Sequence, residues 1–451
     1  MKVLLITVGS RGDAEPYCAM ANSLLNDGHS VDFFLQKDLL YLAPKTPANA
    51  NTLTIHELPF TQMDFYKFMA APTHGVGHPN PRVQFIGIVT DTIAELVFPC
   101  HPAVTEVAAE CDWIVCSSLA RPLALAVGKK FGIKTAVVHL QPLAPTTLFP
   151  HYSLTQQSIE AIFGSDGDDN GQACVPKKEH QESYFELEKF QYDFLEERLD
   201  AVYDALGTKD KKLTFDDLKI ALTGKDELVH IINCFSNELV PSIAADSTLG
   251  PNIHETGAVA DDYIPPELFG PPVVLTDFLS ACEAKGDVPI CIGFGSMPFD
   301  KVAMVLDAVQ ESGKKAVFVG GALQIPDDYE HKAWADGNVC QVSSVPYAWL
   351  LPKCSMMLSH GGAGVLHASA RAGIPALIAP LMGDQMYWGD FVEKMGIGAR
   401  CCVNLSTLTK DDVVEAIRKG DGCIEGAREI GMRIRAAGSG VEAMMKVLNN
   451  A

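Results

Sequence analysis

Three observations predict an α/β protein with two Rossmann-like, doubly wound parallel-sheet domains facing a cleft. Short β-branched runs alternate with longer helical patterns, which is the signature of βαβ units. The alternation stops in a proline-dense stretch and restarts beyond it. The chain has 451 residues, 47% of them apolar, so it is long enough to build two cores.

In the first half, each expected strand is a short apolar run. The expected strands are 3–8, 113–118, 135–140 and 230–235. Residues 16–29 carry apolar side chains at helical spacing, so we expect a helix that opens near Pro16. A polar, Gly- and Asp-rich stretch at about 164–183 is expected to be a mobile loop, followed by a helix near 184–206.

In the second half, the same alternation resumes after a segment dense in proline. The expected strands are 289–297, 315–321, 355–362 and 375–381. These patterns define a first domain at 1–240, an interdomain linker at 241–275 and a second domain at 276–430. Residues 431–451 are expected to hold a C-terminal helix.

The charge of the chain restricts its partners. Lys and Arg number 35 against 56 Asp and Glu, which gives a net charge of -21. Nucleic acid and anionic membrane surfaces would repel such a protein, so we expect no nucleic-acid partner and at most peripheral membrane contact.

The N-terminal apolar run is too short for a signal peptide, and no stretch approaches the ~18–20 apolar residues of a membrane span, so we expect a cytoplasmic protein. The thirteen cysteines include no CxxC pair and indicate reduced, mostly buried thiols.

The first motif is VGSRGDAEP at residues 8–16, where a strand runs into a glycine-rich turn and then a helix. Gly9 and Gly12 permit a tight turn at the carboxyl end of the strand, where open α/β sheets place ligands. Asp13 is held at that turn. Local sequence alone favours Asp13 as a helix cap, and the motif is not the GxGxxG dinucleotide fingerprint.

The second motif is GFGSM at 293–297, again a strand followed by glycines and a hydroxyl. Gly293 and Gly295 would let backbone amides approach a phosphate, and Ser296 could donate to it. A tight turn with Ser296 as a cap is an equally good interpretation.

The third and strongest motif lies within residues 343–392. A buried strand ends at His360, and Gly361, Gly362 and Gly364 open a helix whose free amides point at the end of that strand. Such a helix start is an anion site, with a dipole typically worth ~0.3–1 kcal/mol to a bound anion. The next strand ends at Asp384 and Gln385, whose acceptor and donor groups suit sugar hydroxyls.

Together these motifs resemble the UDP-glycosyltransferase family of GT-B fold, which includes the sterol, glycopeptide and macrolide glycosyltransferases. VGSRGDAEP resembles the N-terminal acceptor-domain motif of the family, and LAPTTLFPH at 143–151 its acceptor-side segment. The stretch 293–400 resembles the donor-binding domain. SVPYAWLLPK and GDQMYWGDFV look most like the sterol glucosyltransferase branch.

The resemblance implies a role for each matching residue. Asp13, three residues before the proline of the first motif, would be the catalytic base, which reverses the preference for a cap. Ser117 and Ser118 stand where plant members of the family carry a second acid. The implied donor-binding residues are Gly12, Ser296, Val345, Pro346, His360, Gly362, Ala363, Gly364, Val365, Asp384 and Gln385. Among them, Val345 and Pro346 would contact the nucleobase, and Asp384 and Gln385 the sugar.

The implied function is transfer of a hexose, glucose from UDP-glucose, to a hydroxyl of a small apolar acceptor such as a sterol, with inversion and without a cofactor or metal. The first domain would bind the acceptor, the second the nucleotide sugar, and the C-terminal helix would cross back to the first domain.

The sequence also departs from the family pattern. Val365 replaces a Thr or Ser, His367 replaces a small residue, and a Trp is missing from 320–323. Two alternatives stay open: a transferase of a thymidine-diphosphate deoxysugar onto a polyketide or lipid, and a catalytically dead nucleotide-sugar-binding scaffold.

Overall fold

The computed structural model describes residues 1–44, 52–164, 174–259, 269–295, 299–320, 323–327 and 329–450, apart from the side chains of residues 69, 70 and 333. The chain forms two compact units. The first unit is Met1–Val259 with Ser439–Ala451, and the second unit is Ala260–Gly438.

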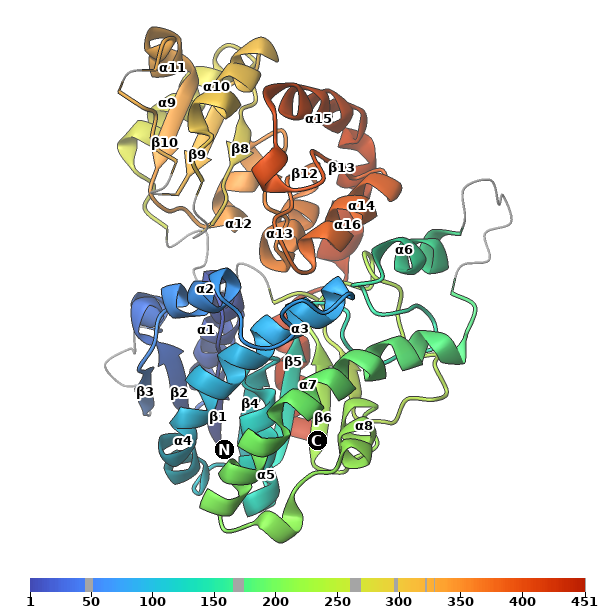
Figure 1. Ribbon diagram of the computed structural model, residues 1–451. Helices are drawn as coiled ribbons and strands as arrows, with labels where there is room; N and C mark the ends of the chain where they lie inside the picture. The colour runs from blue at the N-terminus through green and yellow to red at the C-terminus, as the bar shows by residue number, and fades with distance from the viewer. Residues whose placement is uncertain are drawn as a thin grey trace. The chain divides into compact units, whose positions relative to one another are not determined.

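The first unit is built on a seven-stranded parallel sheet of order β3-β2-β1-β4-β5-β6-β7 (Figure 1). Its strands are β1 Lys2–Ile6, β2 Ser30–Gln36, β3 Leu53–Leu58, β4 Trp113–Ser117, β5 Lys134–His139, β6 Val229–Asn233 and β7 Ile253–Glu255. All four strands expected in the first half are present. The strand order reverses beside β1, so β1 and β4 end at the switch point where such sheets bind ligands.

Helices cover both faces of this sheet. Helix α1 packs against β2 and α17, while α5 packs on β4 and β5 and α3 packs on α7. Helices α3, α5 and α7 lie on the face of the sheet turned toward the viewer in Figure 1. The helices are α1 Arg11–Asn26, α2 Gln62–Ala70, α3 Pro81–Thr92, α4 His101–Ala108, α5 Arg121–Phe131, α6 Thr155–Phe163, α7 Lys178–Ala205, α8 Phe215–Leu222 and α17 Gly440–Asn450.

The second unit has a six-stranded parallel sheet of order β10-β9-β8-β11-β12-β13. The strands are β8 Ile290–Ile292, β9 Ala316–Val319, β10 Val339–Val342, β11 Met357–Ser359, β12 Ala376–Ile378 and β13 Gly398–Arg400. The helices are α9 Val273–Glu283, α10 Val302–Glu311, α11 Lys332–Asn338, α12 Tyr347–Leu350, α13 Ala363–Ala372, α14 Gln385–Lys394, α15 Lys410–Gly422 and α16 Ile424–Ala436. Apolar clusters lie on both faces of the sheet, which is why its strands are apolar throughout. The predicted class of two doubly wound parallel-sheet domains is confirmed.

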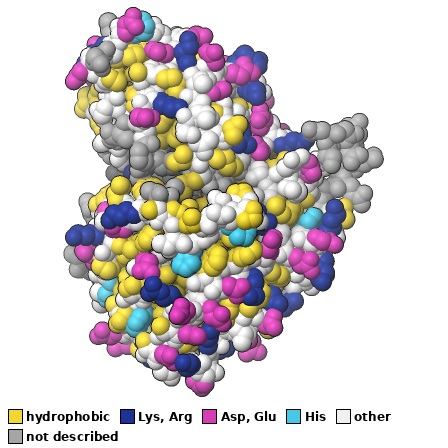
Figure 2. Space-filling model, in the orientation of Figure 1, with side chains coloured by type: hydrophobic (Ala, Val, Ile, Leu, Met, Phe, Trp, Pro, Cys, Tyr) yellow, Lys and Arg dark blue, Asp and Glu magenta, His cyan; other side chains and the backbone are white. Residues whose placement is uncertain are grey.

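Acidic and basic side chains are interspersed on the surface of each unit that Figure 2 draws. Several pair with each other, for example Lys178 with Glu182 and Lys410 with Glu311. Such exposed pairs add little stability, because water and salt screen them. The excess of acidic residues found in the sequence therefore remains the main electrostatic property of the surface.

One helical stretch corrects the expectation that nothing in the chain approaches a membrane span. Pro81–Ala108 runs continuously from α3 through a short π-helical segment into α4, and by length and composition it is apolar enough to cross a membrane. Within the fold, 56% of its most apolar window is buried. Val83, Ile93 and Val97 are fully enclosed, as in a core helix.

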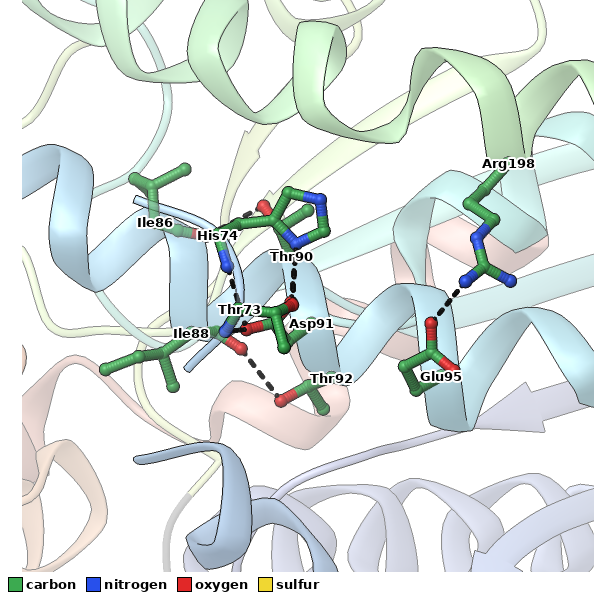
Figure 3. Close-up of polar contacts among 9 residues, drawn as sticks. All are labelled: Thr73, His74, Ile86, Ile88, Thr90, Asp91, Thr92, Glu95 and Arg198. Carbon is green, nitrogen blue, oxygen red and sulfur yellow. Dashed lines mark hydrogen bonds and ion pairs between the residues drawn. The ribbon is translucent and has the colours of Figure 1, made fainter. Parts of the chain in front are cut away.

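A buried carboxylate on α3 fixes the loop before this helix (Figure 3). Asp91 is 1% exposed and accepts hydrogen bonds from the backbone amide (2.6 Å) and hydroxyl of Thr73. It also accepts from the backbone amide of His74 (3.3 Å) and contacts Nδ1 of that ring (2.5 Å). A second pair in the same view, Arg198 with Glu95, joins α7 to the helical stretch after α3.

Two helices start earlier than expected. Helix α1 begins at Arg11 and not near Pro16, because Ser10 already caps it and Pro16 is accommodated inside the helix. Helix α7 begins at Lys178, inside the expected loop at 164–183, because its polar first turn faces solvent while Ser183 and Tyr184 turn inward. Residues 165–173 of that loop lie outside the described residues.

The unit boundaries also differ from the expected ones. The first unit extends past 240 to Val259, because β7 pairs with β6 at the edge of the sheet. Helix α9 begins at Val273, inside the expected linker 241–275, and residues 260–268 lie outside the described part. Residues 431–438 belong to the second unit, and only the segment from Ser439 onward belongs to the first.

Candidate active site

In the first unit, the turn between β1 and α1 holds Asp13 through Ser10. Asp13 is the third residue of α1, and Ser10 is the residue that caps it. The backbone amide (2.7 Å) and the hydroxyl (2.9 Å) of Ser10 both donate to Oδ2 of Asp13. This is a capping box, so the capping role considered in the sequence analysis is present. Oδ1 takes part in neither of these two bonds.

Burial raises the pKa of Asp13, while the hydrogen bonds from Ser10 oppose that rise. The side chain is largely enclosed but remains partly exposed. A carboxylate with a raised pKa is a stronger base than a free one, and solvent access lets a substrate reach it. This geometry can therefore accept a proton from a bound hydroxyl.

Gly9 leaves space for the carboxylate of Asp13 because it has no side chain. Its φ of 144° is a conformation that favours glycine, and a Cβ at this position would lie 2.3 Å from Oδ2 of Asp13. Any side chain at position 9 would therefore displace the carboxylate. The glycine-dependent turn expected at the end of the first strand is present here.

Three polar side chains from other elements hold the backbone of this turn. The amide of Val8 donates to Oγ of Ser117 (3.1 Å), and the amide of Gly9 donates to Oε1 of Gln36 (2.7 Å). Gln62 accepts from the amide of Arg11 (3.3 Å). Ser117, which stands where a second acid was considered, thus supports the backbone. Gln36 and Gln62 were missed, because no local motif marks a glutamine that binds a remote amide.

Pro16 interrupts the hydrogen bonding of α1 close to Asp13. A proline has no N–H, so Pro16 cannot donate to the carbonyl of Gly12, four residues earlier. Gly12 is exposed at the start of α1. The ring of Pro16 lies on the side of that carbonyl, so the exposed backbone of Gly12 is what the expected donor contact at this position would use.

In the second unit, the start of α13 has the predicted anion-site geometry. Gly362 is the N-cap, and the amide of Leu366 makes the first bond of the helix, to the carbonyl of Gly362 (3.0 Å). The amides of residues 363–365 precede that bond and are available to a ligand. At the helix start they carry the positive end of the dipole, and Val365 contributes its amide but no hydroxyl.

His360 lies against the same helix start. A Cβ at Gly362 would lie 2.7 Å from Nε2 of His360, so only glycine lets the ring sit there. Burial lowers the pKa of His360 to about 4, so the ring is neutral at pH 7. Within the described residues its buried Nδ1 has no hydrogen-bond partner. A neutral imidazole donates one hydrogen bond, which suits a phosphate oxygen.

Asp384 and Gln385 lie at the start of α14. The indole Nε1 of Trp388 donates to Oδ2 of Asp384 (2.8 Å). Oε1 of Gln385 accepts from the amides of Leu381 (2.8 Å) and Met382 (3.1 Å). The Gln385 oxygen is therefore committed to its own turn, and contact with a sugar hydroxyl would fall to the amide nitrogen.

The expected nucleobase contacts lie at the start of α12. Val345 and Pro346 are buried, and Pro346 is the N-cap of that helix. A Cβ at Gly293 would lie 2.6 Å from the hydroxyl of Tyr347, so the end of β8 and the start of α12 meet. Ser296 lies outside the described residues.

His367, a departure from the family pattern, joins two parts of this unit. Its Nδ1 contacts the carbonyl of Ala363 (2.7 Å), and its ring packs edge-on against Trp388 with centroids 5.9 Å apart. Trp388 in turn binds Asp384. His367 therefore connects the helix start of α13 to the expected sugar contact.

Among the described residues, no group of three or more His, Cys, Asp or Glu side chains is arranged to hold a metal ion. The hydrogen-bond donors described above for a leaving anion in this part of the second unit are the helix amides of residues 363–365 and the neutral ring of His360.

Comparison with known proteins gives consistent matches. Residues 324–436 match the family model "Erythromycin biosynthesis protein CIII-like, C-terminal domain". A sterol 3-beta-glucosyltransferase of Arabidopsis thaliana is 23% identical over 93% of this chain, and one of Pichia angusta is 23% identical over 99%. The chain spans 62% of the length of the first relative and 33% of the second.

Solved structures agree in fold. A spinosyn rhamnosyltransferase complexed with thymidine diphosphate matches with a TM-score of 0.63 and 17% identity, with all of both chains covered. A glycosyltransferase from Streptomyces nogalater matches with a TM-score of 0.60 and 16% identity over 100% of this chain and 99% of that one. The fold is therefore the GT-B fold of nucleotide-sugar glycosyltransferases. The sequence matches support the resemblance to the UDP-glycosyltransferase family, close to its sterol and antibiotic branches.

Proposed function

We propose that this protein is an inverting glycosyltransferase that moves glucose from UDP-glucose to a hydroxyl of a small apolar acceptor such as a sterol. The observation that carries the proposal is Asp13, a carboxylate with a raised pKa that is partly exposed at the switch point of the first sheet. The relatives named above are sterol 3-beta-glucosyltransferases, which supports the choice of sugar and acceptor class.

In the proposed reaction, the acceptor oxygen attacks the anomeric carbon in line with the bond to the diphosphate. The new C–O bond forms as the old one breaks, so the configuration inverts. The acceptor proton passes to Asp13 during this step, because a carboxylate is far too weak a base to ionise an alcohol beforehand. The diphosphate leaves with the electron pair of the broken bond.

The residues expected at the donor would act on the leaving group and on the sugar. The amides of 363–365 and the ring of His360 would stabilise the diphosphate, with Gly12 and Ser296 as further contacts. Val345 and Pro346 would bind the nucleobase through their backbone, and Asp384 and Gln385 the sugar hydroxyls. We propose that these groups suffice without a bound metal or cofactor.

The remaining parts of the proposal concern location and partners. We propose a cytoplasmic protein whose partners are a nucleotide sugar and an apolar acceptor, with at most peripheral membrane contact and no nucleic acid. The net charge of -21 supports the exclusion of nucleic acid. Fractionation of cells that express the full chain would test the location.

The first experiment is calorimetric titration with UDP-glucose and with dTDP-glucose in the absence of divalent metal. A panel of sterol and flavonoid acceptors follows, with whichever donor binds. UDP-glucose binding and a glycosylated product support the proposal. Binding of dTDP-glucose alone would favour the deoxysugar alternative, and binding without product on any acceptor would favour the scaffold.

A further inference from the structure

The acceptor-side segment, Leu143–His151, is not stabilised by regular backbone hydrogen bonding of its own. It follows β5 and contains neither helix nor strand, yet residues 144–151 are all buried. A buried irregular segment must satisfy its backbone groups with partners from elsewhere. Those partners therefore determine its shape.

One of these partners is Asp246, which lies between β6 and β7 and is 6% exposed. Its Oδ2 accepts from the hydroxyl of Thr146 (2.7 Å) and from the amide (2.6 Å) and hydroxyl (2.9 Å) of Thr147. Its Oδ1 accepts from the amide (2.9 Å) and hydroxyl (2.7 Å) of Thr248. Five donors thus converge on one buried carboxylate.

The start of α7 holds the other side of the segment. The amide of Lys177 (2.8 Å) and the ring of His180 (3.0 Å) contact the carbonyl of Thr147. The amide of His151 donates to Oγ of Ser183 (2.8 Å). Asp246 and the start of α7 therefore both hold the segment, and Asp246 does so through a buried carboxylate.

The segment lies on the same sheet edge as Asp13. Asp13 follows β1 and the segment follows β5, with β4 between them in the sheet. The carboxyl ends of neighbouring parallel strands lie at the same edge of a sheet, ~4.8 Å apart per strand, so the segment follows β5 on the side of the sheet where Asp13 lies.

We infer that Asp246 is a positioning residue for the acceptor: by holding Thr146 and Thr147 it keeps the segment 143–151 in one conformation beside the bound acceptor. The inference rests on the proposed transferase function. Asp246 does not touch the reacting atoms. An asparagine at position 246 has one acceptor oxygen and one NH2 group, so it can serve only one of the two sets of donors.

The test compares Asp246→Asn with Asp32→Asn, a matched control. Asp32 is also a buried carboxylate of the first unit, but it binds Lys2 and His56 near the amino ends of β1–β3, away from the site. We expect Asp246→Asn to raise the KM for the best acceptor of the wild type at least about tenfold. The Kd of UDP-glucose and the rate of UDP-glucose hydrolysis without acceptor should stay within about twofold of the wild-type values. Asp32→Asn should leave all three unchanged. An unchanged KM, or equal losses in transfer, hydrolysis and donor binding, overturns the inference.

Two substitutions of Thr147 provide a milder test if Asp246→Asn folds poorly. Thr147→Val removes one hydroxyl donor to Asp246, whereas Thr147→Ser keeps it. KM should rise in the valine variant and return toward the wild-type value in the serine variant, and equal values in both would contradict the role of Asp246.

Hydrogen exchange separates this inference from the proposed function. Amides in 143–151 should exchange faster in Asp246→Asn than in Asp32→Asn, whether or not any acceptor is turned over. Unchanged exchange overturns the inference by itself. A wild type that forms no product would instead overturn the proposed function and leave the exchange result to decide on Asp246.

Discussion

The backbone amide and the hydroxyl of Ser10 both donate to Oδ2 of Asp13, at 2.7 and 2.9 Å. The capping role and the catalytic role of Asp13 are therefore compatible, because the cap uses one carboxylate oxygen. The cap also fixes the side chain at the end of β1. A base that is held in place loses little conformational freedom when the acceptor binds.

Replacing Asp13 by asparagine should separate the two roles. The amide oxygen of the new side chain can still accept from Ser10, so the fold should be retained, whereas an amide cannot accept the acceptor proton. We expect Asp13→Asn to lower kcat by about 10²–10⁴ with the Kd of UDP-glucose unchanged. Steady-state kinetics and calorimetry measure the two effects. Normal turnover in this variant would show that another group takes the proton.

The pH dependence of kcat/KM should show the effect of the Ser10 hydroxyl on the pKa of Asp13. Asp13 must be ionised to act as a base, so kcat/KM should fall as the pH falls through the pKa of Asp13, which burial raises. The hydroxyl of Ser10 stabilises the ionised form and opposes that rise. Ser10→Ala should therefore move the acid limb to higher pH, while Ser10→Thr, which keeps a hydroxyl, should not. Identical profiles for the two variants would exclude the link.

His360 should bind the donor as a neutral group. Burial lowers its pKa to about 4, so its charge does not change between pH 6 and 8. The Kd of UDP-glucose should be flat over that range, and His360→Ala should weaken binding about tenfold through loss of one hydrogen bond. Calorimetry at pH 6, 7 and 8 measures both. Weaker binding toward pH 8 would mean that a protonated histidine holds the diphosphate.

The sequence predicts elements well where their signal is local. Eight strands were expected from apolar runs, and all eight are present. Five strands were missed, and each contains a polar or charged residue that interrupts its apolar run: β2 has Asp32, β3 has His56, β7 has Glu255, β10 has Gln341 and β13 has Arg400. Pairing with neighbouring strands stabilises them, which no local pattern reveals.

The residues of the candidate site also fall into two groups, those that a local motif marks and those that no local motif marks. Gly9, Gly362 and His360 lie in glycine-rich strand-to-helix turns, so the sequence marks them directly. Gln36 supports the amide of Gly9 from 27 residues away, and Asp246 binds Thr147 from 99 residues away. A side chain that hydrogen-bonds a distant backbone has no characteristic spacing. Such residues become visible only when the fold brings their partners together.

Val365 gives a test of the donor site by gain of function. It lies in the first turn of α13, where its amide precedes the first helical hydrogen bond, and its side chain is partly exposed. Val365→Thr adds a hydroxyl with little change of shape. We expect UDP-glucose to bind about 2–10-fold more tightly, the usual contribution of one hydrogen bond. Val365→Ala is the control without a hydroxyl, and equal affinities in the two variants would contradict a phosphate at this helix start.

Asp91 should make the stability of the first unit depend on pH. Burial alone would raise the pKa of Asp91, but the hydrogen bonds from Thr73 and His74 outweigh it and lower the pKa. A carboxyl group whose pKa is lower in the folded state stabilises the fold above its unfolded pKa of about 3.9, and this contribution is lost as the pH falls through the folded pKa.

At pH 7, Asp91→Asn should therefore lower the free energy of unfolding by about 1–3 kcal/mol, since it leaves buried donors without an acceptor. The difference from the wild type should begin to shrink below about pH 4, where the carboxyl group of the unfolded chain is protonated, and should continue to shrink as the pH falls through the lower pKa of the folded state. Urea titrations across pH measure both values. Glu95→Gln is the control: its partner Arg198 is 56% exposed and Glu95 itself 47%, so we expect a change within about 0.5 kcal/mol. Equal losses in the two variants, or a difference that does not depend on pH, would mean that Asp91 is not ionised in the folded protein.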